Sequence, residues 1–337
     1  MRTLSLHNRF DHIYIEKDVA DHERTKKILA KIKYRNIIYI DHYKDIFNRH
    51  NQSVSIEKEC QSLIIAKKEG RLIYDGAPVC QSFGNEHFYY TSLMMNCMYD
   101  CKYCYLKGMY PSGHMVIFVN LEDYFSKIEE ILKEHPMYIS ISYDSDLLSL
   151  EGLTGYVKKW IEFVDAHENL SVEIRTKAAP LNIWDDLKKC SRVIFAYTIS
   201  LDEVVKNNER LTPSSDERLL SANAALNHGF KVRLCFDPLI YVKDYEEKYR
   251  GLISNVASKI EMDKIEDVSV GTFRISAEFL KNIRKQERSS SVVQFPFENT
   301  DGYYHYPEKI EEKLTQLVFS SLKRYIDEDK ILLWKSR

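Results

Sequence analysis

The sequence predicts an α/β protein built around an open, partial βα barrel of about six strands. Short apolar runs alternate with amphipathic helical stretches from residue 86 onward, a pattern typical of parallel strands joined by helical crossovers. The 337 residues suffice for about two domains. Hydrophobic residues make up 44% of the chain, which is enough for a sizeable core. We expect a small α/β domain over 1–85, the barrel over 86–300 and a helical extension over 301–337.

The N-terminal unit combines both kinds of secondary structure. Its predicted elements are strands over 12–17 and 35–43 and a helix over 21–32. Asp21 is expected to cap this helix. Residues 62–75 hold two apolar runs around Glu69 and Gly70, a pattern typical of a β-hairpin. Glycine and proline mark 76–87 as a loop.

The barrel is predicted from alternating segments, too few for eight closed βα units. Strands are expected over 87–95, 114–120, 138–144, 171–177, 192–200, 231–240 and 265–273. Helices are expected over 121–132 (capped by Asn120), 152–167, 182–190, near Glu203, 214–228 and 244–260. An amphipathic helix over 307–327 and a last strand over 331–334 complete the chain. In such folds the functional groups lie at the carboxyl ends of the strands, where the loop after 87–95 opens.

That loop contains Cys97, Cys101 and Cys104, spaced as Cys-x3-Cys-x2-Cys. Thiolates are soft ligands for zinc or iron–sulfur clusters. A structural zinc site prefers two CxxC knuckles, and this loop contains one. His87 or His114 would have to supply the fourth zinc ligand. A thioredoxin-like CxxC does not require the first cysteine. The pattern favours a 4Fe-4S cluster with three protein ligands, which leaves one iron open.

With an aromatic residue before its last cysteine, this CxxxCxxC loop resembles the radical S-adenosylmethionine (radical SAM) superfamily. Further segments resemble the spore photoproduct lyase family in order and spacing. They are CKYCYLKGMY at 101–110, HMVIFVN at 114–120, SYDSD at 142–146, IRTKA at 174–178, NNERLTPSSDERLLSANAALNHGF at 207–230, FDPLIY at 236–241, FRIS at 273–276 and the helix from 307. The resemblance covers most of the chain.

The resemblance implies a radical SAM lyase that acts on spore photoproduct, a methylene-bridged thymine dimer in DNA. Reductive cleavage of S-adenosylmethionine (SAM) at the cluster gives a 5′-deoxyadenosyl radical, which takes a hydrogen from C6 of the lesion. The bridge then fragments, a protein thiol returns a hydrogen, and SAM is re-formed. The resemblance also implies an external electron donor such as flavodoxin or ferredoxin.

Site residues carry over by position. Cys97, Cys101 and Cys104 match the cluster ligands, and Tyr103 and Tyr105 match two tyrosines implicated in hydrogen relay. The SAM contacts implied by the resemblance are Ser145, Asp146, Lys177 and Thr198, which replaces a serine. Arg274 matches a family arginine and is expected to touch the lesion phosphate.

Tyr143 departs from the family, because the family has its hydrogen-donating cysteine at this place. Three explanations remain open. In the first, Cys80 enters the site from the loop before the first core strand and replaces the family's donor, while Cys190 and Cys235 are expected to be packing residues. Alternatively, Tyr143 is itself the donor. The third explanation is a radical SAM paralogue that acts on a peptide or a modified nucleotide.

Charge gives no global indication of nucleic-acid binding. There are 48 basic and 50 acidic side chains, for a net charge of −2. Any DNA surface must be local, and the candidates are Lys281, Arg284, Lys285 and Arg288, and Lys67, Lys68 and Arg71. No apolar run is long enough to span a membrane. Seven cysteines without a disulfide framework favour the cytoplasm, where thiols stay reduced. A non-catalytic cysteine–metal protein is the alternative outside enzymes.

Overall fold

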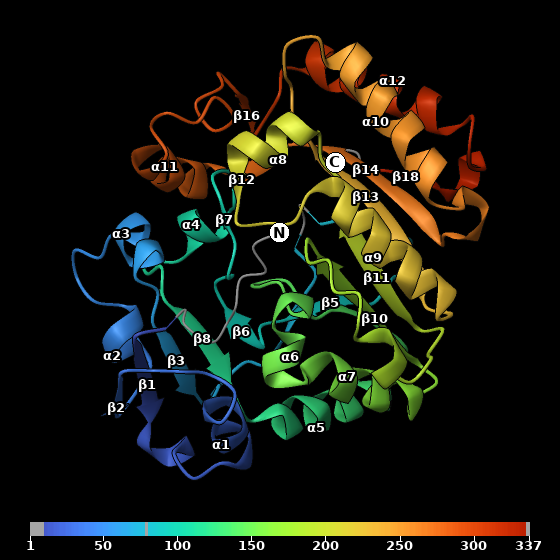
Figure 1. The fold of residues 1–337 in the computed structure, drawn as a ribbon. Coiled ribbons are helices and arrows are strands. Elements are labelled where there is room, and N and C mark those ends of the chain that lie inside the picture. Colours follow the sequence, from blue (N-terminus) through green and yellow to red (C-terminus); the bar gives the residue numbers. More distant parts are fainter. Residues whose placement is uncertain (1–9, 78–79, 335–337) are drawn as a thin grey trace.

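The main sheet confirms the predicted open barrel. The structure, a computed structural model, describes residues 10–77 and 80–334 (Figure 1). Its eight-stranded sheet has the order β18-β14-β13-β11-β10-β9-β5-β4. The strands are β4 (Ile73–Asp75), β5 (Phe88–Thr91), β9 (Met137–Ser140), β10 (Leu170–Thr176), β11 (Val193–Thr198), β13 (Lys231–Leu239), β14 (Asp267–Thr272) and β18 (Ile331–Leu333). All neighbours pair in parallel except β4 and β5, so the carboxyl ends of β5 to β18 meet at one edge.

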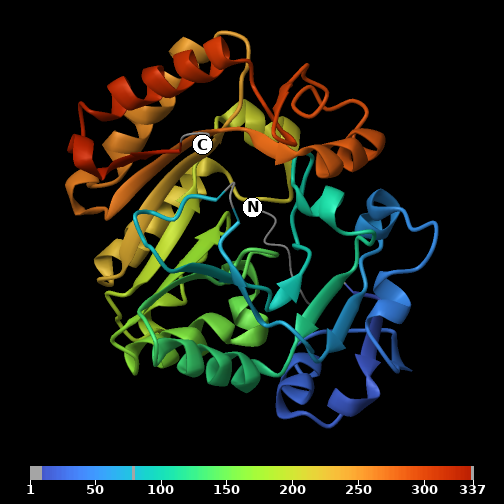
Figure 2. The same cartoon turned by 180° about the vertical axis from the view of Figure 1, so that it is seen from behind.

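Helices cover the outer face of the curved sheet, as Figures 1 and 2 show. They are α5 (Leu121–Leu132), α6 (Glu151–Thr154), α7 (Tyr156–Asp165), α9 (Ser215–Asn227), α10 (Tyr245–Lys259) and α12 (Glu308–Leu322). Gly155, in a left-handed conformation, separates α6 from α7, where one helix was predicted. Ser214 and Glu217 form a capping box that starts α9. Trp160 of α7 is fully buried against the core.

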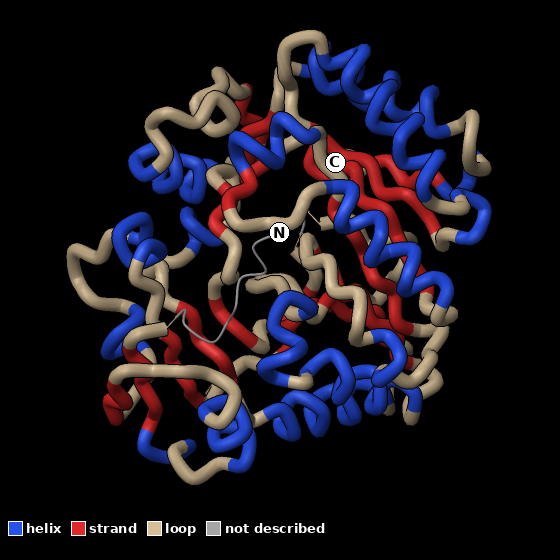
Figure 3. The backbone as a smooth tube through the Cα atoms, in the orientation of Figure 1, coloured by secondary structure: helices blue, strands red, loops and turns tan. Residues whose placement is uncertain are grey.

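A second sheet joins the N-terminal unit to the barrel. Its order is β2-β1-β3-β8-β6, which combines β1 (His12–Glu16), β2 (Asn36–Ile40) and β3 (Leu63–Ala66) with β6 (Met94–Met95) and β8 (Met115–Phe118). The short helices α1 (Glu23–Leu29), α2 (Lys44–Phe47) and α3 (Val54–Glu59) pack around it (Figure 3). Strands from both sides of residue 85 share this sheet. The division into domains at this residue stays a prediction.

Five local predictions are wrong. The strand at 114–120, expected in the barrel, is β8 and pairs with β3 in the sheet of the N-terminal unit. Residues 62–75 are not a hairpin, because β3 lies between β1 and β8 in one sheet while β4 pairs with β5 in the other. The run 87–95 splits into β5 and β6, which belong to different sheets. Residues 182–190 form only a 3-10 turn at Trp184–Asp186, whose buried tryptophan explains the apolar signal. The N-cap of α1 is His22, whose Nδ1 accepts a hydrogen bond from Arg24 N, so Asp21 is not the cap.

A buried polar layer lies near the amino ends of the barrel strands. The Arg233 guanidinium donates to both oxygens of Asp267, to Glu173 and to the Tyr138 hydroxyl, the last at 2.8 Å. The Phe83 ring lies 3.4 Å from this guanidinium and closes the layer from the loop before β5. Charges buried this deeply persist because each carboxylate meets its cation.

We expect Arg233→Met to lower the free energy of unfolding by about 3–5 kcal/mol, because two carboxylates lose their buried partner. Urea unfolding followed by circular dichroism measures the change. Lys188→Met is the control, since it removes a solvent-exposed ion pair with Asp165 and should leave the curve nearly unchanged. Equal curves for the two variants would contradict the role given to the buried layer.

Candidate active site

The cysteine loop lies at the carboxyl edge of the sheet and is held from outside by a short strand. β7 (Asp100–Cys101) pairs antiparallel with β12 (Glu209–Arg210), so Glu209 lies opposite Cys101. Lys102 N donates to Asn208 O at 2.7 Å, at the end of α8 (Asp202–Asn208). These backbone hydrogen bonds fix the middle of the loop. Figure 1 shows β7 beside β12.

A compact ion cluster fixes the end of the loop. Lys107 Nζ lies 2.7 Å from Asp100 Oδ1 and also pairs with Glu287, while Arg210 pairs with the same two carboxylates at 2.6 and 3.0 Å. The helix α4 (Leu106–Met109) packs on α11 (Ala277–Gln286) through Gly108, where a Cβ would collide with Phe279. Charge pairing and close packing therefore both hold the loop against α11.

The three cysteine thiols fit a cluster that takes one thiolate per iron. Burial raises the pKa of Cys97 to about 12 and also raises the pKa of Cys101. Such thiols ionise when a metal binds them. Within residues 10–77 and 80–334, no three His, Cys, Asp or Glu side chains gather closely enough to hold one metal ion. A 4Fe-4S cluster spreads its cysteines over separate irons, which matches this donor set better than a single zinc.

The histidines considered for zinc are engaged elsewhere. His114 Nδ1 accepts a hydrogen bond from Ser62 N, and its Nε2 lies 3.9 Å from Glu57. The His87 ring stacks on His135 at 3.8 Å, next to the amino end of β5. His87 therefore lies at the opposite edge of the sheet from the cysteine loop.

The predicted SAM contacts follow β9, β10 and β11 at the same edge as the cysteines. Asp146 accepts hydrogen bonds from Thr176 Oγ1 at 2.8 Å, Lys177 N at 2.7 Å and Ser149 N at 3.1 Å. The carboxylate thus ties the ends of β9 and β10 together, and its role as a SAM contact stays a prediction. Ser145 lies beside Met94, and Thr198 is buried at the end of β11.

Glu209 is a buried anion at the centre of the site, and sequence reasoning missed it. It accepts hydrogen bonds from Arg218 Nη2 at 2.5 Å, from Ser200 Oγ at 2.8 Å and from the Tyr103 hydroxyl. Lys177 Nζ lies 3.9 Å from its carboxylate and 5.4 Å from the Tyr103 ring.

Burial raises the pKa of Glu209, but the charges of Lys177 and Arg218 outweigh it and hold the pKa at about 2. Glu209 is therefore ionised throughout the physiological pH range. The available sequence signal was an acidic residue, Glu209, directly before Arg210 and nine residues before Arg218 within 207–230. This spacing does not match a known catalytic or ligand-binding motif by itself.

The structure brings Cys80 to Tyr143. Their Sγ and Oη atoms are 3.9 Å apart. The Tyr143 ring lies 5.6 Å from the Tyr105 ring, and the Tyr105 hydroxyl donates to the Tyr143 carbonyl. Cys235 and Cys190 are buried, as expected for packing residues. The predicted thiol thus lies against Tyr143, which in turn contacts Tyr105 at the end of the cysteine loop.

Arg274 is held by protein groups. It pairs with Asp237 through two nitrogens at 2.8 and 3.2 Å, and its guanidinium lies 4.0 Å from the Trp334 ring. Arg175 Nη2 lies 3.3 Å from the same carboxylate. In the predicted basic cluster, Arg284 donates to the carbonyls of Val293 and Phe295, so one of its members fixes a loop.

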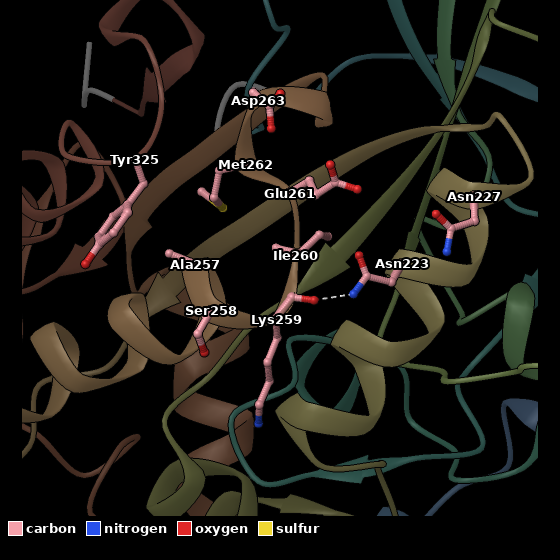
Figure 4. A pocket seen from close by; sticks show the side chains of 10 residues that line it. All are labelled: Asn223, Asn227, Ala257, Ser258, Lys259, Ile260, Glu261, Met262, Asp263 and Tyr325. Carbon is pink, nitrogen blue, oxygen red and sulfur yellow. Dashed lines mark hydrogen bonds between the residues drawn. The ribbon is translucent and has the colours of Figure 1, made fainter.

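A surface pocket of about 550 Å³ lies away from this site. Asn223 and Asn227 of α9 and the chain after α10 line it, and Asn223 donates to the Lys259 carbonyl (Figure 4). Both segments precede strands β13 and β14, so the pocket is at the amino edge of the sheet. It shares no residue with the cysteine loop.

Comparison with known proteins identifies the family of this chain. The sequence model of the spore photoproduct lyase family matches residues 9–331. Spore photoproduct lyase of Clostridium acetobutylicum is 24% identical over 280 residues, which are 77% of this chain and 78% of that protein. Spore photoproduct lyase of Bacillus subtilis is 26% identical over 177 residues, 51% of this chain and 52% of that protein.

Solved structures show the same fold. A spore photoproduct lyase variant superposes with a TM-score of 0.81 at 18% identity, covering 96% of this chain and 98% of its own. Another variant, solved with bound AdoMet and dinucleoside spore photoproduct, has a TM-score of 0.81 at 19% identity and the same coverage. Because the family model spans nearly the whole chain, this protein belongs to the spore photoproduct lyase family.

Proposed function

We propose that this protein is a radical SAM lyase that reverses spore photoproduct in DNA, with Cys80 as its hydrogen donor. The observation that carries the proposal is the position of the Cys80 thiol, 3.9 Å from the hydroxyl of Tyr143, whose carbonyl accepts a hydrogen bond from Tyr105 of the cysteine loop. A related enzyme solved with AdoMet and dinucleoside spore photoproduct supports the substrate class.

Cys97, Cys101 and Cys104 would hold the 4Fe-4S cluster. When bound, the cluster and SAM supply a 5′-deoxyadenosyl radical. Lys177 offers its ammonium group to the SAM carboxylate, with Ser145, Asp146 and Thr198 lining the same strand ends. Glu209 holds Lys177 in place by an ion pair and Tyr103 by a hydrogen bond.

Cys80 and Tyr143 supply the returning hydrogen. Burial raises the pKa of the Cys80 thiol and the pKa of Tyr143, so both keep their protons at neutral pH. The Cys80 S–H bond breaks as its hydrogen passes to the carbon radical left after bridge fragmentation. Tyr143 then gives its O–H hydrogen to the sulfur, and the tyrosyl radical that results regains a hydrogen from the cofactor side by way of Tyr105 and Tyr103.

The remaining assignments complete the proposal. Arg274, oriented by Asp237, is placed to meet the lesion phosphate. An electron donor such as flavodoxin or ferredoxin would reduce the cluster, and the reduced thiols favour a cytoplasmic setting. No helix in the described part of the chain is long and apolar enough to cross a membrane.

A second candidate function is that of a radical SAM paralogue with a different substrate. Tyr143 favours it, because a phenol stands where the family has its donor cysteine. Incubation with dinucleoside spore photoproduct separates the two: the lyase releases the repaired thymine dinucleotide TpT. SAM cleavage without any TpT would contradict the lyase assignment and favour the paralogue.

We expect Cys101→Ala to lose most of its iron and acid-labile sulfide, because one of three cluster ligands is gone. Metal analysis after anaerobic reconstitution measures the loss, and circular dichroism checks the fold. Cys190→Ala is the matched control, since that buried cysteine lies outside the loop and should leave the iron content unchanged. Normal iron in Cys101→Ala would contradict the ligand assignment.

We expect Cys80→Ala to keep cleaving SAM while TpT formation falls by at least tenfold, because the carbon radical loses its hydrogen donor. Liquid chromatography of 5′-deoxyadenosine and TpT from the same reaction measures the split. Cys235→Ala serves as the control thiol, since it is fully buried on β13. If Cys80→Ala forms TpT as fast as the Cys235 variant, another group is the donor.

We expect Lys177→Met to raise the KM for SAM by at least tenfold, because one charge-assisted contact is worth about 1.5–3 kcal/mol. Initial rates of 5′-deoxyadenosine release at varied SAM give KM and kcat. Lys102→Met, on the same loop edge, controls for a general loss of positive charge. An unchanged KM would place the SAM carboxylate elsewhere.

A further inference from the structure

Four tyrosine rings form a continuous row from the cysteine loop to the molecular surface. Tyr105 follows the last cysteine, and its ring centre is 5.6 Å from that of Tyr143. Tyr143 stacks on Tyr90 at 4.1 Å, and Tyr90 stacks on Tyr74 at 5.1 Å. Each spacing is that of directly packed aromatic rings.

The strand register builds this row. Tyr74 of β4 lies directly opposite Tyr90 of β5 in the antiparallel pair, which places both rings on one face. Tyr90 in turn lies beside Ser140 of β9, three residues before Tyr143. Tyr89 points to the other face of β5, where its hydroxyl contacts His135.

The outer end of the row reaches solvent. The Tyr74 hydroxyl donates to the carbonyl of Arg71 at 2.8 Å, and the exposed Arg71 guanidinium lies 5.2 Å from the Tyr74 ring. The inner end reaches the thiol, since Tyr143 contacts Cys80. The three outer rings thus join the Cys80 thiol to the surface through directly packed aromatic side chains.

We propose that Tyr143, Tyr90 and Tyr74 form a second, outward path that carries an unpaired electron from Cys80 to the surface whenever the radical does not return to the cofactor side through Tyr105. Phenol O–H and thiol S–H bonds are similar in strength, so each transfer is close to balanced. A thiyl radical at Cys80 takes a hydrogen from Tyr143, which restores the S–H bond and leaves a tyrosyl radical.

The radical then moves outward by coupled transfer of one electron and one proton at each step. Tyr90 reduces Tyr143, Tyr74 reduces Tyr90, and each oxygen regains its proton. Burial raises the pKa of all three phenols, so the neutral phenol is the form restored each time. A small-molecule thiol in solution finally gives its hydrogen to Tyr74 and becomes a thiyl radical.

This inference rests on the proposed thiol chemistry, but its first test needs neither SAM nor lesion. A ruthenium photo-oxidant is attached to Arg71→Cys in a Cys60→Ser background, which removes the exposed native cysteine. After a flash, the label oxidises Tyr74, whose proton passes to water. We expect slow recombination as the radical moves inward, and recombination several-fold faster when Tyr90→Phe blocks the path.

Tyr89→Phe is the matched control and should recombine like the parent, whereas Tyr90→Trp, which is again oxidisable, should restore slow recombination. Phenylalanine keeps the ring, so the comparison isolates redox activity from packing. Equal recombination in Tyr90→Phe and Tyr89→Phe would overturn the path. Absence of TpT formation together with an intact Tyr90 effect would contradict the proposed function alone.

A turnover experiment tests the direction of use. In the presence of lesion, SAM and a small thiol, we expect Tyr90→Phe and Tyr74→Phe to lose activity after several-fold fewer turnovers than Tyr89→Phe. Freeze-quench electron paramagnetic resonance should show a tyrosyl signal in Tyr89→Phe that changes in Tyr90→Phe. Equal lifetimes and equal spectra would overturn the exit role.

Discussion

The site depends on one buried carboxylate. Glu209 lies opposite Cys101 in the β7–β12 pair, and the positive charges of Lys177 and Arg218 keep its carboxyl group ionised. A charge buried this completely is stable only while its cations stay in place, so the carboxylate forces β10, α9 and the cysteine loop to meet. Tyr103 completes the arrangement by donating its hydroxyl to the same group. The loop is thereby positioned by electrostatics as well as by backbone pairing.

The substitution of Tyr143 for a cysteine becomes understandable once Cys80 is placed beside it. The loop before β5 is anchored inside the barrel, where the Phe83 ring covers Arg233 and Gln81 accepts a hydrogen bond from Ser269 at 3.0 Å. This anchoring brings the thiol to the phenol. In the function that we propose, the donor has moved to another segment of the chain, and the neighbouring tyrosine is its partner.

Much of the barrel was predictable because each strand is an apolar run followed by a helix with one buried face. The three cysteines could be recognised as candidate cluster ligands because their spacing is local in sequence. The prediction of a hairpin at 62–75 was wrong because β3 is buried on both faces of a parallel sheet. The sequence of such an apolar run does not indicate which strands it pairs with. Glu209 and Tyr90 were missed for a related reason: their roles arise from contacts with residues far away in the chain.

The most direct test of the account is a Mössbauer spectrum of the protein reconstituted with enriched iron, recorded with and without SAM. We predict a 4Fe-4S cluster in which a unique iron site changes its parameters when SAM is added, because three cysteines leave that iron open to the cosubstrate. A spectrum unaffected by SAM, or a protein that retains zinc in place of iron, would contradict the central claim.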